Sequence, residues 1–147
     1  MGRQGGFTLL EMIVVIVLVA VALSVVSFSL SKGLDSLRAR EAGRDLSLAL
    51  RAARAQAITD GQPTRVAFDV PGRRYQAPGQ PVHALPPRMA LRLTTAAALR
   101  LGQQGSIQFY PDGSSTGGNV RLERDGRAWR VDVAWLTGDV RWQEVQP

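Results

Sequence analysis

The near-N-terminal apolar run constrains this chain more than any other feature of its sequence. Residues 7–30 read FTLLEMIVVIVLVAVALSVVSFSL, and Glu11 is the one charged residue among them. As a helix rising 1.5 Å per residue, the run would span about 36 Å, against about 30 Å for the hydrocarbon core of a bilayer. Because apolar side chains occur on every side, such a helix needs lipid or an apolar bundle around it.

Three interpretations of this run compete. A secretory signal peptide has a shorter apolar stretch followed by a small-residue cleavage site, and residues 27–34 contain no A-x-A-like site. A plain transmembrane anchor fits the length but not Glu11, since a carboxylate near a membrane core costs about 2.5–3.5 kcal/mol. The third interpretation gives Glu11 a partner.

The leader MGRQGG followed by FTLLE resembles the N-terminus of type IV prepilins and pseudopilins. The resemblance implies that prepilin peptidase removes residues 1–6 by cutting after Gly6. It also implies that Phe7 becomes the N-methylated new N-terminus, and that Glu11 pairs with the N-terminal ammonium of a neighbouring subunit. One position departs from the family, because Gly5 stands where many members have a basic residue.

Elementary electrostatics gives the same arrangement a reason. Cutting after Gly6 creates a cation at the end of a helix, with Glu11 one turn further along, and a helix N-terminus favours nearby negative charge. A pair of charges in apolar surroundings need not add net stability. It would set the register, because helices that slide past each other leave an unpaired charge. The sequence does not decide whether the pair stabilises the assembly or sets its register.

The helix is predicted to continue through residues 31–62, where its pattern becomes amphipathic. Gly61 and Pro63 provide the expected stop. The apolar stripe of this half falls at three- and four-residue spacing and consists of Ala39, Ala42, Leu46, Ala49, Leu50, Ala53 and Ala57.

Residues 63–147 change to a period of two, with short apolar alternations separated by turn residues. Residues 76–88 are proline-rich and are predicted to form a loop. The whole chain is therefore predicted to be α+β and pilin-like. A long N-terminal helix would pack on antiparallel β-sheets in a sandwich-like domain.

A second resemblance narrows the family. Residues 107–120, IQFYPDGSSTGGNV, resemble the FxPDGSSxGG stretch of general secretion pathway protein H (the GspH/FimT family), and residues 51–70 and 131–141 are also similar. We call residues 111–118 the signature turn. Its family residues are Pro111, Asp112, Gly113, Ser114, Ser115, Gly117 and Gly118.

The resemblance implies a minor pseudopilin that supports protein export across the outer membrane by type II secretion. Its expected partners are prepilin peptidase, the major pseudopilin, other minor pseudopilins and, before assembly, inner-membrane lipid. The expected location is a single-pass inner-membrane protein with a periplasmic C-terminal domain. Assembly is expected near the filament tip, with Glu11 favouring a place below the outermost subunit. The alternative is a minor type IV pilin of the FimT or FimU kind, in pilus assembly or DNA uptake.

The residues themselves predict turn geometry, not ligand binding, for the signature turn. It lacks the alternating acidic ligands of a calcium loop and the lysine of a phosphate-binding loop. His83 is the single histidine and has no nucleophile motif beside it, so neither an enzyme, a metal nor a cofactor is predicted. The chain has no cysteine, which excludes a disulfide framework.

We interpret the basic charge as a property of the protein surface and the tryptophans as residues of the core. The net charge of +6 comes from arginines scattered through the chain, so nucleic-acid binding is not expected. Trp129 and Trp135 share one parity within a predicted strand run, Trp142 falls in the next strand, and all three are predicted to lie in the core.

Overall fold

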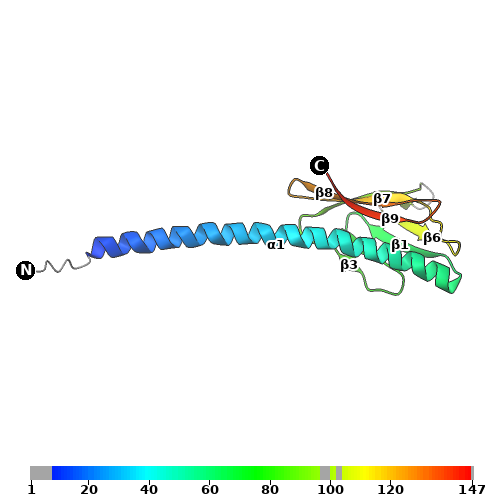
Figure 1. Cartoon of the computed structure of the whole chain (residues 1–147), viewed down its shortest axis with the longest axis horizontal. Helices are drawn as coiled ribbons and strands as arrows, with labels where there is room; N and C mark the ends of the chain where they lie inside the picture. The colour runs from blue at the N-terminus through cyan, green and yellow to red at the C-terminus, as the bar shows by residue number, and fades with distance from the viewer. Residues whose placement is uncertain (1–7, 97–99, 102–103, 147) are drawn as a thin grey trace, which may run out of the picture. The chain divides into compact units, whose positions relative to one another are not determined.

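The computed structural model describes residues 8–96, 100–101 and 104–146, and for residues 25–35 and 100–101 it describes the backbone alone. The chain divides into two compact units, Met1–Leu37 and Arg38–Pro147, which we describe separately. Helix α1 (Leu9–Asp60) contributes to both units (Figure 1). Gly6 and Phe7 lie outside the described residues.

In the first unit, the described side chains of α1 are exposed from Leu9 to Ser24. Leu9 is 79% exposed and Leu18 is 63% exposed. The Ser24 hydroxyl donates to the Ala20 carbonyl oxygen at 2.6 Å, so this polar group is satisfied within the helix. Over the side chains that are described, no helical stretch is both long and apolar enough to cross a membrane.

In the second unit, the remaining turns of α1 bury the predicted stripe. Leu46, Leu50 and Ala57 are fully buried, and Ala42 packs against the same core at its edge. The helix ends at Asp60, and Gly61 follows with a φ of +64°. This left-handed conformation is the usual helix terminator and costs glycine little. The predicted period and stop are therefore confirmed.

Two antiparallel sheets complete the second unit (Figure 1). The five-stranded sheet has the order β3 (His83–Ala84), β2 (Arg74–Gln76), β1 (Thr64–Asp69), β6 (Gln104–Phe109) and β5 (Arg100–Leu101). The four-stranded sheet has the order β4 (Ala90–Thr94), β7 (Gly118–Arg124), β8 (Arg127–Val133) and β9 (Val140–Val145). One passage of the chain from the first sheet to the second lies between β6 and β7, through the signature turn, and another lies between β3 and β4.

One continuous core joins the helix to both sheets. Alternate residues of β1, β6, β7 and β8 point into it, as the period of two requires. Its largest fully buried side chains are Trp129, Phe68, Phe109, Leu46, Leu50, Met89, Ile107 and Leu122. The predicted α+β architecture, a long helix on antiparallel sheets, is confirmed.

The prediction for the tryptophans is wrong at one position. Trp129 is 1% exposed and Trp142 packs at the edge of the core, but Trp135 is 69% exposed. The alternation fails there because β8 ends at Val133 and the next residues turn toward β9. Residues 76–88 also differ from a plain loop, since they contain β3, which pairs with Arg74 and Tyr75 of β2.

The packing of Trp142 explains why residue 43, in the middle of α1, is a glycine. A Cβ at this position would lie 2.5 Å from Nε1 of the Trp142 indole. The helix therefore lacks a side chain where β9 places a large ring beside it. Arg40, one turn earlier, lies over the same ring at 5.8 Å from its centroid. A glycine that weakens the isolated helix is thus required by packing.

Candidate functional site

The start of α1 is built by a capping interaction that the sequence analysis missed. The Glu11 backbone N–H donates to the Thr8 hydroxyl at 3.2 Å, and the Met12 N–H donates to the Thr8 carbonyl oxygen at 3.2 Å. Thr8 is therefore the N-cap residue, with Glu11 at the third helical position. Thr-x-x-Glu before an apolar run is the sequence signal of a capping box, and it was available in the residues FTLLE.

The Glu11 carboxylate lies on the exposed surface of the first helical turn. Among the residues that the structure describes, it forms no ion pair. The partial positive charge of the helix N-terminus favours a carboxylate in this turn, so Glu11 has a local reason to be there as well as the predicted role in pairing. The predicted cleavage at Gly6 and methylation at Phe7 concern residues outside the described part.

Around Glu11 the helix surface is apolar on every side. Side chains of leucine, isoleucine, valine and methionine are 46–79% exposed from Leu9 to Leu23. A contiguous apolar surface of this kind marks a place where a protein meets lipid or other protein chains. The first unit is therefore incomplete as a single chain in water.

The first part of the signature turn is closed by its own hydrogen bonds. The Gly113 N–H donates to the Tyr110 carbonyl oxygen at 2.9 Å, and the Tyr110 N–H donates to the Ser114 carbonyl oxygen at 3.0 Å. Oδ1 of Asp112 accepts from the Ser114 hydroxyl at 2.6 Å and from its N–H at 2.9 Å. These donors hold the pKa of Asp112 below its usual value of 3.8, because they stabilise the ionised carboxylate.

The second part of the turn is anchored on the loop between β8 and β9. Ser115 is buried, and its hydroxyl donates to the Ala134 carbonyl oxygen at 2.9 Å and accepts from the Gly117 N–H at 3.0 Å. The Ser115 N–H donates to the Trp135 carbonyl oxygen at 2.8 Å. Gly118, at a φ of +132°, lies where a Cβ would collide with the backbone of Thr94.

Two arginines of α1 tie the helix to the signature turn and to the start of β9. Nε of Arg54 donates to the Gly113 carbonyl oxygen at 3.0 Å, and Arg51 donates to the Val140 carbonyl oxygen at 2.9 Å. The signature turn thus joins the helix, the strand crossover and the loop before β9. Its polar groups are largely engaged with the protein itself, as the prediction of turn geometry requires.

The other residues considered for catalysis or ligand binding are dispersed over the second unit. His83 lies on β3 with its ring stacked on Tyr75, far in sequence from the serines of the signature turn. Within residues 8–96, 100–101 and 104–146, no three histidine, aspartate or glutamate side chains gather as metal ligands would. Several arginines of the four-stranded sheet have acidic neighbours, among them Arg121 with Glu123 at 2.6 Å and Arg130 with Asp132 at 2.7 Å. These pairs reduce the positive charge that the sheet presents to phosphates.

The helix and its two antiparallel sheets define a pilin-like protein. The minor pseudopilin EpsH from the type 2 secretion system of Vibrio cholerae has the same fold, with a TM-score of 0.59, 17% sequence identity and coverage of 73% of this chain and 97% of that one. The type IV minor pilin FimU of Pseudomonas aeruginosa also shares it, with a TM-score of 0.53, 13% identity and coverage of 71% and 87%. At these identities the likeness concerns the fold alone.

Sequence comparison identifies the particular family. Residues 42–138 match the family of type II transport protein GspH, and residues 1–27 match the prokaryotic N-terminal methylation motif. The type II secretion system protein H of Xanthomonas campestris pv. campestris is 44% identical over 137 residues, which cover 92% of this chain and 81% of that protein. The chain belongs to the GspH family, the minor pseudopilins of type II secretion. The family predicted from the sequence is confirmed.

Proposed function

We propose that this pseudopilin is inserted in the bacterial inner membrane, cut after Gly6 by prepilin peptidase, N-methylated at Phe7 and built into a periplasmic filament near its tip. Family membership and the methylation motif over residues 1–27 support this course. The observation that carries it is the apolar surface of α1, exposed on every side from Leu9 to Leu23. Lipid covers that surface before assembly, and the helices of neighbouring subunits cover it afterwards.

Glu11 takes part in assembly under this proposal. Processing would leave Phe7 as the N-terminus, directly before the N-cap residue Thr8, so that the new ammonium lies next to the helix start. Glu11 of one subunit then pairs with the ammonium of the next. The pair selects one axial register, because any other register leaves both charges unpaired among apolar side chains.

The proposed partners are prepilin peptidase, the major pseudopilin and the other minor pseudopilins. The second unit faces the periplasm, where its sheets present charged and polar side chains to water. A position below the outermost subunit follows from Glu11, since a subunit with this carboxylate can accept the ammonium of a neighbour.

Mass spectrometry of the mature protein tests the processing step. We expect a chain that begins at Phe7 and carries one methyl group on its α-amino nitrogen. The sample is purified from cells with active prepilin peptidase, and cells lacking the peptidase serve as the control. Retention of residues 1–6 in the first sample would refute the proposed cleavage.

Substitution of Glu11 tests the assembly step. We expect Glu11→Ala and Glu11→Gln to be cleaved normally but to enter filaments poorly, because both lack the negative charge. Thr8→Ala is the matched control, since it removes the N-cap hydroxyl and keeps the carboxylate. Normal incorporation of Glu11→Gln, or equal losses in Glu11→Gln and Thr8→Ala, would remove the proposed pairing role and leave helix capping.

The alternative function, a minor type IV pilin in pilus assembly or DNA uptake, has the support of fold likeness to FimU. Salt-dependent binding of DNA by the full chain in detergent would favour it. The sequence identity to type II secretion system protein H favours the secretion role.

A further inference from the structure

The loop between β8 and β9, residues 134–139, carries the most exposed large apolar side chains described in the second unit. Trp135 is 69% exposed and its neighbour Leu136 is 65% exposed, whereas no other such side chain in this unit exceeds the 53% of Val82. Single exposed apolar residues are ordinary on a protein surface, but adjacent ones form a patch that favours contact with another molecule. We call Trp135 and Leu136 the loop patch.

The signature turn fixes the backbone beneath the loop patch. The Ser115 N–H donates to the Trp135 carbonyl oxygen at 2.8 Å, and the Ser115 hydroxyl donates to the Ala134 carbonyl oxygen at 2.9 Å. Gly117 has a φ of +67°, and a Cβ there would lie 3.0 Å from the Cβ of Trp135. These contacts hold the loop and leave its two large apolar side chains in water.

The loop also closes on itself. The Ala134 N–H donates to the Asp139 carbonyl oxygen at 2.9 Å, and the Gly138 N–H donates to the Ala134 carbonyl oxygen at 2.8 Å. A Cβ at Gly138 would collide with the Gly113 carbonyl oxygen of the signature turn. Because the backbone is held in one conformation, binding through the loop patch requires little ordering of the loop. A rigidly presented tryptophan is typical of the residues that dominate binding at protein interfaces.

The polar residues beside the loop patch indicate that its occupant is a protein. Asp139 and Arg141 form an ion pair of 2.9 Å, with side chains 52% and 82% exposed. An apolar centre with a polar rim is the usual anatomy of a protein interface. Binding to anionic lipid or to nucleic acid would need an excess of cations beside the patch, and this ion pair is neutral overall.

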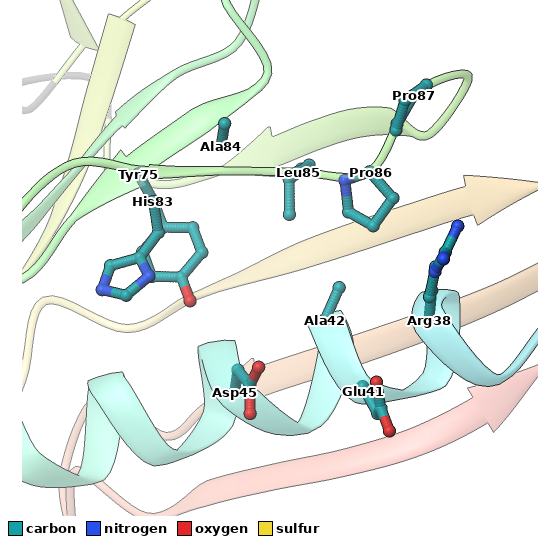
Figure 2. Close-up of a pocket in the computed structure, with 10 residues that line it drawn as sticks. All are labelled: Arg38, Glu41, Ala42, Asp45, Tyr75, His83, Ala84, Leu85, Pro86 and Pro87. Atoms are coloured by element: carbon teal, nitrogen blue, oxygen red, sulfur yellow. The ribbon is translucent and has the colours of Figure 1, made fainter. Parts of the chain in front are cut away.

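The cavity between α1 and the segment before β4 has a different character (Figure 2). Arg38 lines it together with Glu41 and Asp45, so its helix side carries charges of both signs. Tyr75 and Leu85, which line the opposite side, are at most 9% exposed. The large apolar side chains of this cavity are thus covered by the chain itself, unlike those of the loop patch.

The size of the loop patch indicates which kind of protein contact it makes. A large aromatic side chain contributes about 150–250 Å² of buried surface, and a stable interface needs about 800 Å² from each partner. Two side chains fall well short of that area, so the occupant is one that another surface already holds nearby. In the proposed filament, the exposed apolar surface of α1 supplies that other contact. A small additional contact then gains from a high effective concentration.

We infer that Trp135 and Leu136 insert into an apolar pocket on the globular domain of an adjacent pseudopilin subunit in the filament. The indole is the anchor, Leu136 widens the apolar contact, and the signature turn holds both in place. This inference rests on the proposed function, because assembly through α1 brings the adjacent subunit within reach. It adds a contact that Glu11 does not make, and it gives the signature turn a role in positioning the loop.

Photo-cross-linking in cells that express the whole secretion system tests this contact. In the full chain, Trp135 is replaced by the photoreactive residue p-benzoylphenylalanine, and adducts are identified by mass spectrometry. We expect an adduct with a pseudopilin that is lost in cells lacking the major pseudopilin. The matched control has the same replacement at Val82, an exposed residue of another loop, and should give several-fold less of this adduct.

Substitutions separate docking from a structural role. The double variant Trp135→Ala, Leu136→Ala should be cut after Gly6 and keep its Tm within about 3 °C of the native value, since both side chains are exposed. Its recovery in filaments should fall several-fold. Trp135→Phe, Leu136→Met keeps the apolar side chains and should restore most of that recovery. Ser115→Ala should lower both Tm and recovery, because it removes the hydroxyl that holds the loop. Val82→Ala is the control and should enter filaments as the native chain does.

The proposed function and this inference fail in different ways. Chains that keep residues 1–6, or that never enter filaments, would contradict the proposed function and the inference with it. Processed and incorporated chains without a pseudopilin adduct from position 135 would contradict the inference alone. So would equal adduct yields from positions 82 and 135, an adduct with phospholipid in place of protein, or a dimer of this chain that forms without the major pseudopilin. A large fall in Tm in the Trp135→Ala, Leu136→Ala variant would make the loop patch part of the fold.

Discussion

The two parts of α1 share one backbone geometry and have opposite surfaces. From Leu9 to Leu23 the large apolar side chains are all at least 46% exposed. In the second unit the stripe residues Leu46, Leu50 and Ala53 are at most 1% exposed. The comparison teaches that apolar content alone does not decide burial. Residues of the second part are covered by the sheets of the same chain, whereas those of the first part need other molecules.

The two parts also differ in polar anchoring. Beyond Arg38 the helix is fixed by Arg51, which donates to the carbonyl oxygen of Val140 at the start of β9, and by Arg54, which donates to that of Gly113 in the signature turn. In the stretch from Thr8 to Ser24, the hydroxyls of Thr8 and Ser24 form their hydrogen bonds within the helix itself. Apart from Glu11, a helix whose polar groups are satisfied internally can exchange partners without losing hydrogen bonds. The second part is therefore a fixed element of a fold, and the first is an element of assembly.

The largest effect is expected from a matched pair of leucine truncations. Leu50→Ala should lower the free energy of unfolding of the second unit by about 2–5 kcal/mol, because it leaves a cavity in a full core. Leu18→Ala should leave that free energy unchanged. Chemical denaturation of the full chain in detergent, followed by tryptophan fluorescence, to which the buried Trp129 contributes, measures both. Equal losses would break the distinction between the two parts of the helix.

The arginine anchors should come next. Arg54→Gln should cost about 1.5–3 kcal/mol of stability, since a hydrogen bond from a charged donor to the Gly113 carbonyl oxygen is lost. Arg44→Gln is the control, because Arg44 is exposed and its side chain forms no hydrogen bond or ion pair with a described residue. The same denaturation measurement applies. If both variants lose equal stability, the effect belongs to the charge of the helix and not to the signature turn.

A smaller effect is expected at Gly43. Alanine is a better helix former by about 1 kcal/mol, but its Cβ would meet Nε1 of Trp142 at 2.5 Å. Overpacking of this kind costs about 1–3 kcal/mol, so Gly43→Ala should destabilise the unit modestly.

A double-mutant cycle separates these two contributions at Gly43. In a Trp142→Leu background, the same alanine should be neutral or stabilising. Destabilisation of equal size in both backgrounds would show that the indole is not the cause.

Much of this molecule follows from local sequence patterns. The stripe from Ala39 to Ala57 and the stop at Gly61 were predicted because helical period and left-handed termination are local properties. The signature turn was correctly assigned to turn geometry, since its glycines and its Asp112-Gly113 pair define backbone conformations. The family was identified from the same residues.

The features that could not be predicted from the sequence depend on where strands end and on contacts between residues that are distant in the chain. Trp135 was placed in the core because its parity matched that of Trp129, but parity carries no information beyond the end of a strand. The need for Gly43 arises from Trp142, which lies far along the chain. The cap by Thr8, in contrast, is a local feature that the Thr-x-x-Glu spacing of Thr8 and Glu11 indicates.

The smallest expected effect is a loss of thermal stability at low pH, and we expect it in the second unit alone. The pKa of Asp69 lies below its usual 3.8 because the Gly72 N–H and the Arg74 side chain donate to its carboxylate. The pKa of Asp112 is lowered by the Ser114 hydroxyl and N–H. Each lowered pKa contributes stability that is complete above the unfolded value and is lost as the pH falls through the folded value. The Tm of the second unit should therefore decline as the pH falls below about 4.

Calorimetry of the full chain in detergent from pH of about 6 to about 2 measures this decline. The double variant Asp69→Asn, Asp112→Asn should have a flatter acid limb than the native chain, because neither amide titrates. The helicity of the first part should change little over the same range if its apolar surface is covered by detergent, since that part relies on apolar contact and not on paired carboxylates. An identical acid limb in the native chain and the double variant would assign the acid sensitivity to other carboxylates. A loss of helicity in the first part at the same pH would mean that the two parts of α1 do not respond to acid as separate elements.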